Sequence, residues 1–170
     1  MGQEEAFERI VSGREPEELP LVLAPDEIAR FLESVSGLRN RVALTTAYAA
    51  GLRVGEVCRL KVASIDSERM LIHVEGGKGA KDRHAMLSPR LLDVLRAYWR
   101  RARPGLWLFP GRDAGEHVSI AALQDACRAA RRGMKTNKPV TAHCLRHYSA
   151  VFDERGFSSA QMETKDDRFR

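Results

Sequence analysis

The sequence predicts an α+β fold that is mainly α-helical and holds one small antiparallel sheet of three strands. Apolar residues recur at helical spacing in several segments, and two short strand-like runs flank a single glycine-rich turn. A chain of 170 residues of which 44% are hydrophobic can bury one sizeable core. We therefore expect one domain over residues 21–156. An acidic arm or linker over 1–20 precedes it, and a disordered tail without apolar periodicity follows over 157–170.

The first half of the domain is predicted to begin with three helices. Pro25 suits the first turn of a helix, and the apolar stripe that follows it ends before Gly37. A second helix is expected over 39–48, with Gly51 stopping it, and a short third helix over 53–60. The stripe of the first helix consists of Ile28, Phe31, Leu32 and Val35.

The middle of the chain predicts the sheet. Residues 70–74 and 84–87 favour two strands around the turn at 76–83, which together form an antiparallel hairpin. Residues 106–111 are expected to add a third strand at the edge.

The remaining helices are delimited by their capping residues. Pro89 begins an amphipathic helix that ends near 103–105, Ser119 caps the next one, and Thr141 caps a last helix that Gly156 ends. Four residues are expected on the buried side of the helix from Pro89: Leu91, Leu92, Leu95 and Trp99. Tyr48 and Tyr98 lie in helical patterns typical of the core.

Charge is distributed unevenly along the chain. The net charge is +5, yet the first twenty residues are acidic, and residues 126–152 contain no Asp or Glu at all. A positive stripe of this kind is typical of a surface that binds a polyanion, although a solvated helix face gives the same pattern. The basic residues of this stretch are Arg128, Arg131, Arg132, Lys135, Lys138 and Arg146.

The cysteines and the absence of long apolar runs predict a cytoplasmic protein. Cys58, Cys127 and Cys144 are odd in number and lack metal or redox spacing, so we expect small, partly buried thiols in a reducing compartment. No apolar run is long enough to cross a bilayer, and the N-terminus lacks the pattern of a signal peptide.

Five residues could hold and cleave a phosphodiester. Arginine binds two phosphate oxygens with its planar fork, and Arg53 and Arg146 each lie close to the start of a predicted helix. Lys78 lies between two glycines at the hairpin turn, where it could donate a proton. His143 precedes Arg146 by three residues on one helix face, and Glu56 follows Arg53 by three. Each residue alone has a plainer interpretation, as a surface arginine, a turn lysine or a helix ion pair.

Taken together and in this order, these segments resemble the catalytic domain of the tyrosine recombinases, the integrase and Xer-like family that breaks and rejoins DNA. Residues 50–60 resemble the first arginine box, 77–83 the lysine turn and 141–147 the second box. The resemblance implies an integrase-like catalytic core, with Arg53 and Arg146 clamping the scissile phosphate. It implies Lys78 as the general acid, His143 as a further proton-transfer or phosphate ligand, and Glu56 as support for them.

The resemblance also implies the partners. Double-stranded DNA is the expected substrate, other recombinase subunits are the expected protein partners, and no membrane is involved. No metal or other cofactor is implied, because the arginines supply the positive charge. We expect DNA contacts from Lys81 and Arg83 beside the turn and from the basic stretch, at Arg128, Arg131, Arg132, Lys135 and Lys138.

The chain departs from the family after the second box. A Leu-Gly-His segment and a nucleophilic tyrosine are expected there, but the only later tyrosine is Tyr148, two residues past Arg146. We therefore expect a recombinase core truncated before its nucleophile. The alternative is a non-catalytic DNA-binding remnant of a recombinase. A type IB topoisomerase-like enzyme or an unrelated helical protein with a basic face would also fit parts of this pattern.

Overall fold

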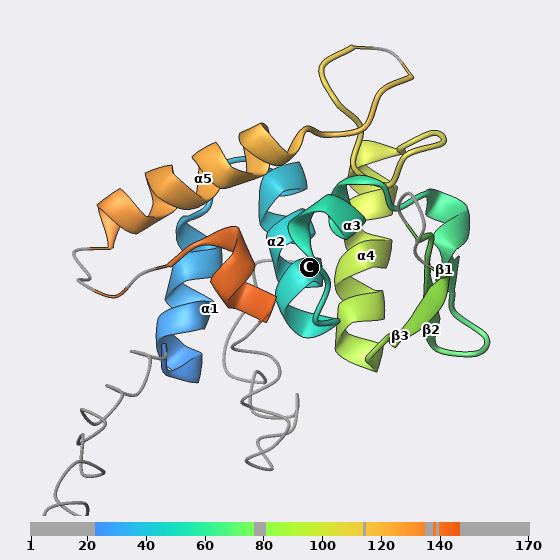
Figure 1. Cartoon of the computed structure of the whole chain (residues 1–170), viewed down its shortest axis with the longest axis horizontal. Helices are drawn as coiled ribbons and strands as arrows, with labels where there is room; N and C mark the ends of the chain where they lie inside the picture. Colours follow the sequence, from blue (N-terminus) through green and yellow to red (C-terminus); the bar gives the residue numbers. More distant parts are fainter. Residues whose placement is uncertain (1–22, 77–80, 114, 135–137, 139, 147–170) are drawn as a thin grey trace, which may run out of the picture.

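A computed structural model describes residues 23–76, 81–113, 115–134, 138 and 140–146. The described elements are α1 (Pro25–Ser34), α2 (Leu38–Ala49), α3 (Val54–Cys58), the 3₁₀ turn η1 (Val62–Ser64), β1 (Ile65–Asp66), β2 (Leu71–Val74), β3 (Arg83–Met86), α4 (Pro89–Ala102) and α5 (Ile120–Gly133). Residues 142–146 are also helical. The fold is α+β and mainly helical, as predicted, with the sheet lying to one side of the helices (Figure 1).

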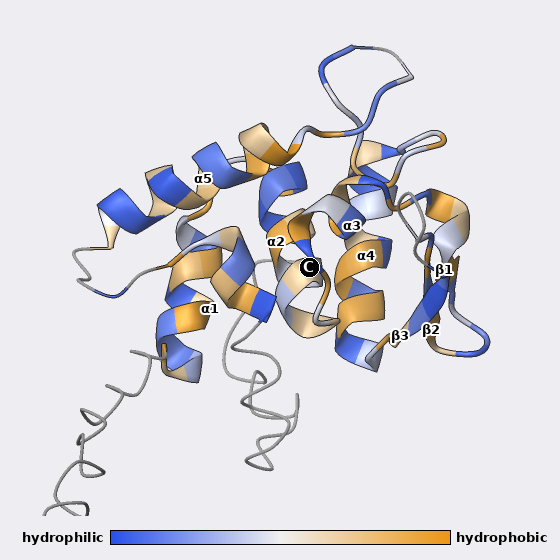
Figure 2. Cartoon of the chain, in the orientation of Figure 1, coloured by the Kyte–Doolittle hydropathy of each residue, from blue (hydrophilic) through white to orange (hydrophobic). Residues whose placement is uncertain are grey.

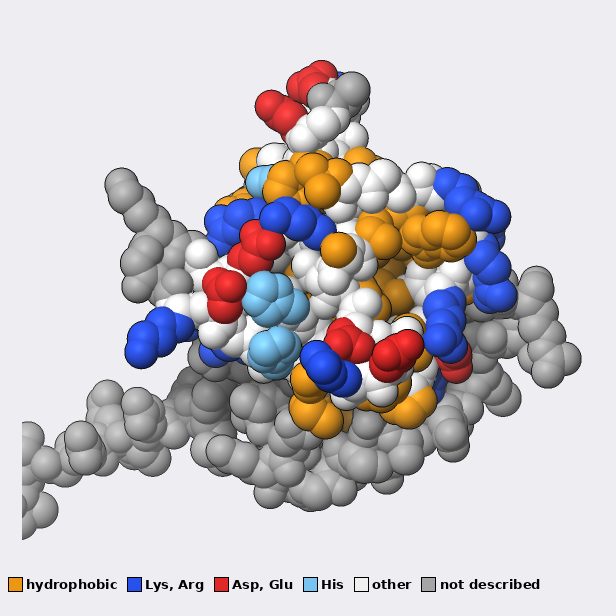
Figure 3. All heavy atoms as spheres, turned by 90° about the vertical axis from the view of Figure 1, so that its right-hand side faces the viewer, with side chains coloured by type: hydrophobic (Ala, Val, Ile, Leu, Met, Phe, Trp, Pro, Cys, Tyr) orange, Lys and Arg blue, Asp and Glu red, His pale blue; other side chains and the backbone are white. Residues whose placement is uncertain are grey.

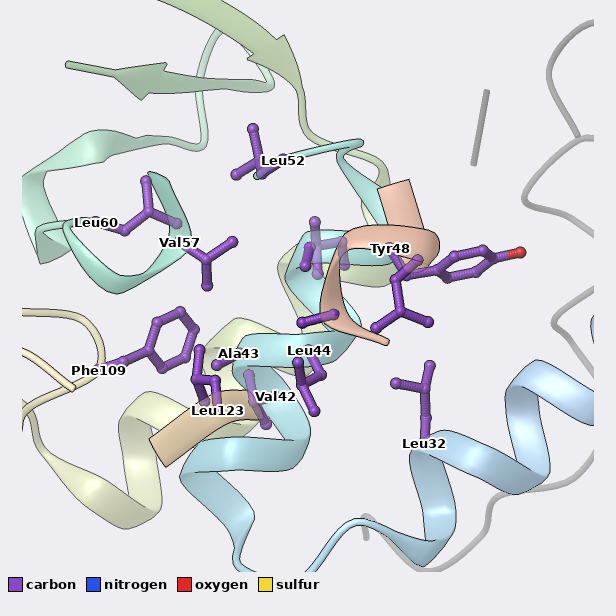
Figure 4. Close-up of a cluster of buried hydrophobic side chains, with 14 of the residues drawn as sticks. Leu32, Val42, Ala43, Leu44, Tyr48, Leu52, Val57, Leu60, Phe109 and Leu123 are labelled. Carbon is purple, nitrogen blue, oxygen red and sulfur yellow. The ribbon is translucent and has the colours of Figure 1, made fainter. Parts of the chain in front are cut away.

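Helix α2 is the centre of the domain. It contacts α1, α3, α4 and α5, and six of its twelve residues are buried. Its two ends are set by glycines with positive φ, Gly37 at 80° and Gly51 at 62°, a conformation that other residues adopt only at a cost. The buried residues of α2 are Val42, Ala43, Leu44, Thr46, Ala47 and Tyr48. Several of them meet side chains from α1, α3 and α5 in the core shown in Figure 4.

The sheet has the order β1-β2-β3 and is antiparallel throughout. The predicted hairpin is confirmed, with His73 opposite His84 in the register of β2 and β3. The predicted third strand is wrong: β1 takes the edge position, and residues 106–111 lie outside the sheet. The Leu108 N–H instead donates to the Leu60 carbonyl at 2.8 Å, and the Val62 N–H donates to that of Leu106 at 3.1 Å. A two-residue strand such as β1 is too short to show any periodicity in the sequence.

Helix α4 confirms its predicted start and most of its buried side. Ser88 accepts a hydrogen bond from the Leu91 N–H at 3.2 Å and so caps the helix. Leu91, Leu92 and Leu95 are buried with Tyr98, but Trp99 is 39% exposed, which corrects its predicted place in the core. The guanidinium of Arg103 covers the indole ring at 4.5 Å, a cation–π contact that shields part of an otherwise exposed ring.

The last two described helices begin at the predicted caps. The Ser119 hydroxyl accepts a hydrogen bond from the Ala122 N–H at 3.1 Å, and Thr141 accepts one from the Cys144 N–H at 3.2 Å. Hydrophilic residues recur along α5 in Figure 2, while its buried side carries Leu123, Cys127 and Ala130. The predicted end at Gly156 and the segments 1–20 and 157–170 lie outside the described residues.

Candidate functional site

Arg53 is held at a fixed point but keeps its charged end in solvent. Helix α2 ends at Ala49, the chain turns at Gly51, and the side chain of Leu52 is fully buried. Arg53 then occupies the N-cap position of α3, and its side chain is 60% exposed. A buried residue directly before an exposed arginine fixes the backbone while leaving most of the arginine side chain exposed to solvent.

Glu56 connects Arg53 to the sheet. One carboxylate oxygen, Oε2, accepts the backbone N–H of Arg53 at 2.7 Å and Nη2 of Arg83 at 2.9 Å. The other, Oε1, lies 3.4 Å from Nη1 of Arg53. Burial opposes ionisation of Glu56, whose side chain is only 12% exposed, but the hydrogen bonds from Arg53 and Arg83 outweigh it. The pKa of Glu56 is therefore lowered, and the group is a carboxylate at neutral pH.

The hairpin brings a second acidic side chain next to the lysine turn. Lys78 itself lies outside the described residues. Asp82 Oδ1 accepts the Gly76 N–H at 2.8 Å, and its Oδ2 lies 3.3 Å from Nε2 of His73. The rings of His73 and His84 lie 5.3 Å apart, and two adjacent His side chains are visible on this face in Figure 3. Sequence reasoning missed Asp82, although an acidic residue beside a glycine turn is a recognisable signal.

The second box lies on the short helix at 142–146. Ala142 and Leu145 are buried in the core together with Val140, while His143 is exposed and Arg146 is partly exposed. Because Ala142 and Leu145 are buried, the two candidate site residues, His143 and Arg146, lie on the side of the helix that is nearer to solvent. Figures 1 and 4 both show this helix beside α2, the helix that leads into Arg53. Both boxes are thus attached to the same central element.

The basic stretch is less free than its composition suggests. Lys138 Nζ pairs with Glu27 of α1 at 2.6 Å, and Arg128 pairs with Asp125 one turn earlier on α5. Arg131 and Arg132 are exposed, and Lys135 lies outside the described residues. In Figure 3 acidic, basic and hydrophobic side chains are interspersed on the sheet side, where Lys81 is also exposed. Lys138 and Arg128 are paired because their acidic partners, Glu27 and Asp125, lie outside the acid-free residues 126–152.

Two of the three tyrosines belong to the core. Tyr98 is 2% exposed and Tyr48 is 8% exposed, as predicted. Burial raises the pKa of the Tyr98 hydroxyl, which makes it a poorer nucleophile at neutral pH. Tyr148 lies outside the described residues.

The described part of the chain offers neither a membrane span nor a metal cluster. None of its helices is long and apolar enough to cross a membrane. Nor do three or more His, Cys, Asp or Glu side chains gather within it in a way that could hold a metal ion.

Comparison with known proteins matches most of the chain to one family. Residues 22–152 match the model of the phage integrase family. An integrase/recombinase of Sinorhizobium fredii (strain NGR234), y4qK, is 51% identical over 138 residues, which cover 81% of this chain and 45% of that protein. The chain therefore spans about half the length of the curated relatives it matches.

Solved structures agree with this match. The crystal structure of XerA recombinase superimposes with a TM-score of 0.68 at 27% identity, covering 93% of this chain and 55% of that one. XerH site-specific recombinase bound to its difH substrate gives a TM-score of 0.64, also at 27% identity, and covers 81% of this chain and 44% of that one.

Proposed function

Because the chain belongs to the phage integrase family, we propose that it serves site-specific DNA recombination by binding the phosphodiester at which a DNA strand is cut and rejoined. The observation that carries the proposal is the setting of Arg53. Its backbone is fixed by buried Leu52 and by Glu56, while 60% of its side chain is open to solvent. This is the arrangement that an anion site needs: a preorganised cation whose donors are still available.

The proposed chemistry assigns one task to each residue. Arg53 and Arg146 hold the non-bridging oxygens of the scissile phosphate, where negative charge grows during attack. Lys78 donates a proton to the leaving 5′-oxygen, and His143 assists as a proton-transfer group or phosphate ligand. Glu56 keeps Arg53 in place. The attacking nucleophile of the family is a tyrosine, which becomes joined to the 3′-phosphate as the 5′-oxygen leaves.

The proposed substrate is double-stranded DNA. The XerH relative was solved with its difH substrate, and its likeness to this chain covers 81% of the chain. Further recombinase subunits are the proposed protein partners. A second candidate function is phosphate clamping without strand cleavage. The burial of Tyr48 and Tyr98 makes both of them poor candidates for the attacking nucleophile.

Salt-dependent DNA binding tests the proposal. Fluorescence anisotropy with a labelled duplex should show an affinity that falls steeply between about 50 mM and about 200 mM salt, because phosphate contacts release counterions. Arg53→Ala and Arg146→Ala should each weaken binding roughly ten- to a hundredfold, since an arginine–phosphate contact contributes about 1.5–3 kcal/mol. Arg96→Ala is a matched control, because Arg96 is an exposed arginine on α4, a helix that carries neither box.

Thermal melting of the same variants separates binding from folding. Arg53 and Arg146 contribute little to the core, so their variants should melt close to the unmodified protein. Binding that is absent at low salt, or insensitive to salt, contradicts the proposal. Equal losses of melting temperature in the two variants would identify the arginines as structural ion pairs.

A further inference from the structure

The carboxylate of Glu56 has two arginines beside it, and they contact it unequally. Arg83 Nη2 lies 2.9 Å from Oε2, whereas Nη1 of Arg53 lies 3.4 Å from Oε1. The stronger hydrogen bond between the charged groups therefore comes from β3. Arg53 makes its short contact with Glu56 through the backbone N–H instead, at 2.7 Å.

This inequality matters because a poorly solvated carboxylate needs a counter-ion. Only 12% of the Glu56 side chain is exposed, so an unpaired negative charge at this position would be costly. Arg83, on strand β3, supplies this counter-ion. Without Arg83, Arg53 would be the nearest counter-ion, and its guanidinium would be drawn onto Glu56 and away from solvent.

Resting on the proposed function, we propose that Arg83 is a positioning residue: it neutralises Glu56 so that the Arg53 guanidinium stays available to bind phosphate. Arg83 thereby acts on DNA binding through Glu56, whereas the sequence suggests direct contact with DNA. Its side chain is 39% exposed, less than the 60% of Arg53. The same contact joins the hairpin of β2 and β3 to α3, across 27 residues of sequence.

A mutant cycle distinguishes the two roles of Arg83. Arg83→Gln should weaken duplex binding roughly tenfold, as the loss of one arginine–phosphate contact does. In a Glu56→Gln background, Arg83→Gln should have no effect, because the glutamine is uncharged and its side-chain oxygen can still accept the Arg53 N–H. An equal effect in both backgrounds would show that Arg83 contacts DNA directly and would overturn the inference.

Two further variants complete the design. Lys81→Gln is the matched control, since Lys81 is an exposed cation two residues before Arg83, and within the described residues it makes no ion pair. Its effect on binding should be the same in both backgrounds. Arg83→Lys keeps the positive charge and should restore part of the affinity. An Arg83→Lys protein that binds no better than Arg83→Gln would contradict the role of charge neutralisation.

A measurement without DNA separates this inference from the proposed function. The carboxyl carbon of Glu56 can be titrated by NMR in the free protein. Arg83→Gln should raise the pKa of Glu56, while Lys81→Gln should leave it unchanged. If the unmodified protein fails to bind duplex DNA, the proposed function fails, and the titration still decides whether Arg83 neutralises Glu56. An unchanged Glu56 titration in Arg83→Gln overturns the inference whatever the DNA result.

Discussion

Glu56 is a carboxylate with low solvent exposure. The stability of the folded protein should therefore depend on the protonation of Glu56, and so on pH. Hydrogen bonds from Arg53 and Arg83 outweigh the effect of burial and lower its pKa. A lowered pKa contributes stability that is fully present above the unfolded value, about 4.3, and is lost as pH falls through the folded value. Protonation of Glu56 at low pH thus removes the charged interactions that it makes with Arg83 and Arg53 at neutral pH.

The expected result is a pH-dependent difference between two proteins. At pH 7 the unmodified protein should have a higher melting temperature than Glu56→Gln, because only the former has the charged hydrogen bonds to Arg83 and Arg53. The difference should shrink as pH falls below about 4 and Glu56 becomes protonated. Melting curves at several pH values measure it. A difference that stays constant from neutral pH into acid would show that the charge of Glu56 does not stabilise the fold.

The three thiols should differ in reactivity. Cys58 and Cys127 are buried, and burial raises the pKa of Cys58 to about 11 and that of Cys127 to about 12. Cys144 is only partly buried. Because the thiolate is the reactive form, a thiol reagent at about pH 8 should modify Cys144 in the folded protein well before Cys58 and Cys127. Mass spectrometry of the labelled peptides gives the order, and Cys144→Ser should remove the fast phase.

Residues whose partners are near in sequence could be predicted, and those with distant partners could not. Ser119 and Thr141 are recognisable as caps because a cap lies within three residues of the N–H that it accepts. The Lys138–Glu27 pair joins positions 111 residues apart, and Arg83 meets Glu56 across 27. The sequence alone does not reveal either pair, because each cation contacts its acidic partner only in the folded chain.

At the scale of elements, periodicity predicted where the helices lie better than it predicted which of their residues face the core. In α4 the core residue after Leu95 is Tyr98, three positions on, and Trp99, four positions on, faces outward under Arg103. Both spacings lie on the same side of a helix, so the sequence cannot choose between them. Neither β1 nor the path of 106–111 had a periodic signal, since pairing in both depends on neighbours from elsewhere in the fold.

The hairpin of β2 and β3 offers a test at this scale. Asp82 accepts the Gly76 N–H, a hydrogen bond that lowers the pKa of the Asp82 carboxyl and closes the stem below the lysine turn. Asp82→Ala should speed hydrogen exchange of the Gly76 amide several-fold, because the amide loses its acceptor. The global melting temperature should change little, because Asp82 is exposed. Asp93→Ala, an exposed acid on α4, serves as the control. An unchanged Gly76 amide would show that the stem closes without Asp82.

At the scale of the whole molecule, one helix supports both arginine boxes. Helix α2 leads through Gly51 into Arg53, and the helix at 142–146 lies beside it. Damage to the core around α2 should therefore disturb both arginines at once, whereas changes in the hairpin should act through Glu56 on Arg53. The family and the fold were predictable because the two boxes and the hairpin have local signatures. The support that α2 gives to both boxes follows only from the packing of the helices.

The 170-residue chain, tested alone, should form no covalent complex with DNA. Covalent cleavage needs a nucleophile in line with the leaving oxygen, and Tyr48 and Tyr98 are both buried. Tyr148 follows Arg146 by two residues, and on a continuous helix this spacing rotates it about 200° away, at ~100° per residue. A tyrosine so placed would face away from a phosphate that Arg146 holds.

A nicked suicide duplex tests this expectation, because cleavage of such a substrate traps the protein on the DNA. Denaturing gels of the same chain should show no shifted protein–DNA band. A XerA recombinase with a duplex that carries its own site is the positive control. The chain should still bind the intact duplex at low salt, so that a missing band reflects the lack of an aligned nucleophile. A shifted band that disappears in Tyr148→Phe would instead make Tyr148 the nucleophile and the chain a strand-cleaving core.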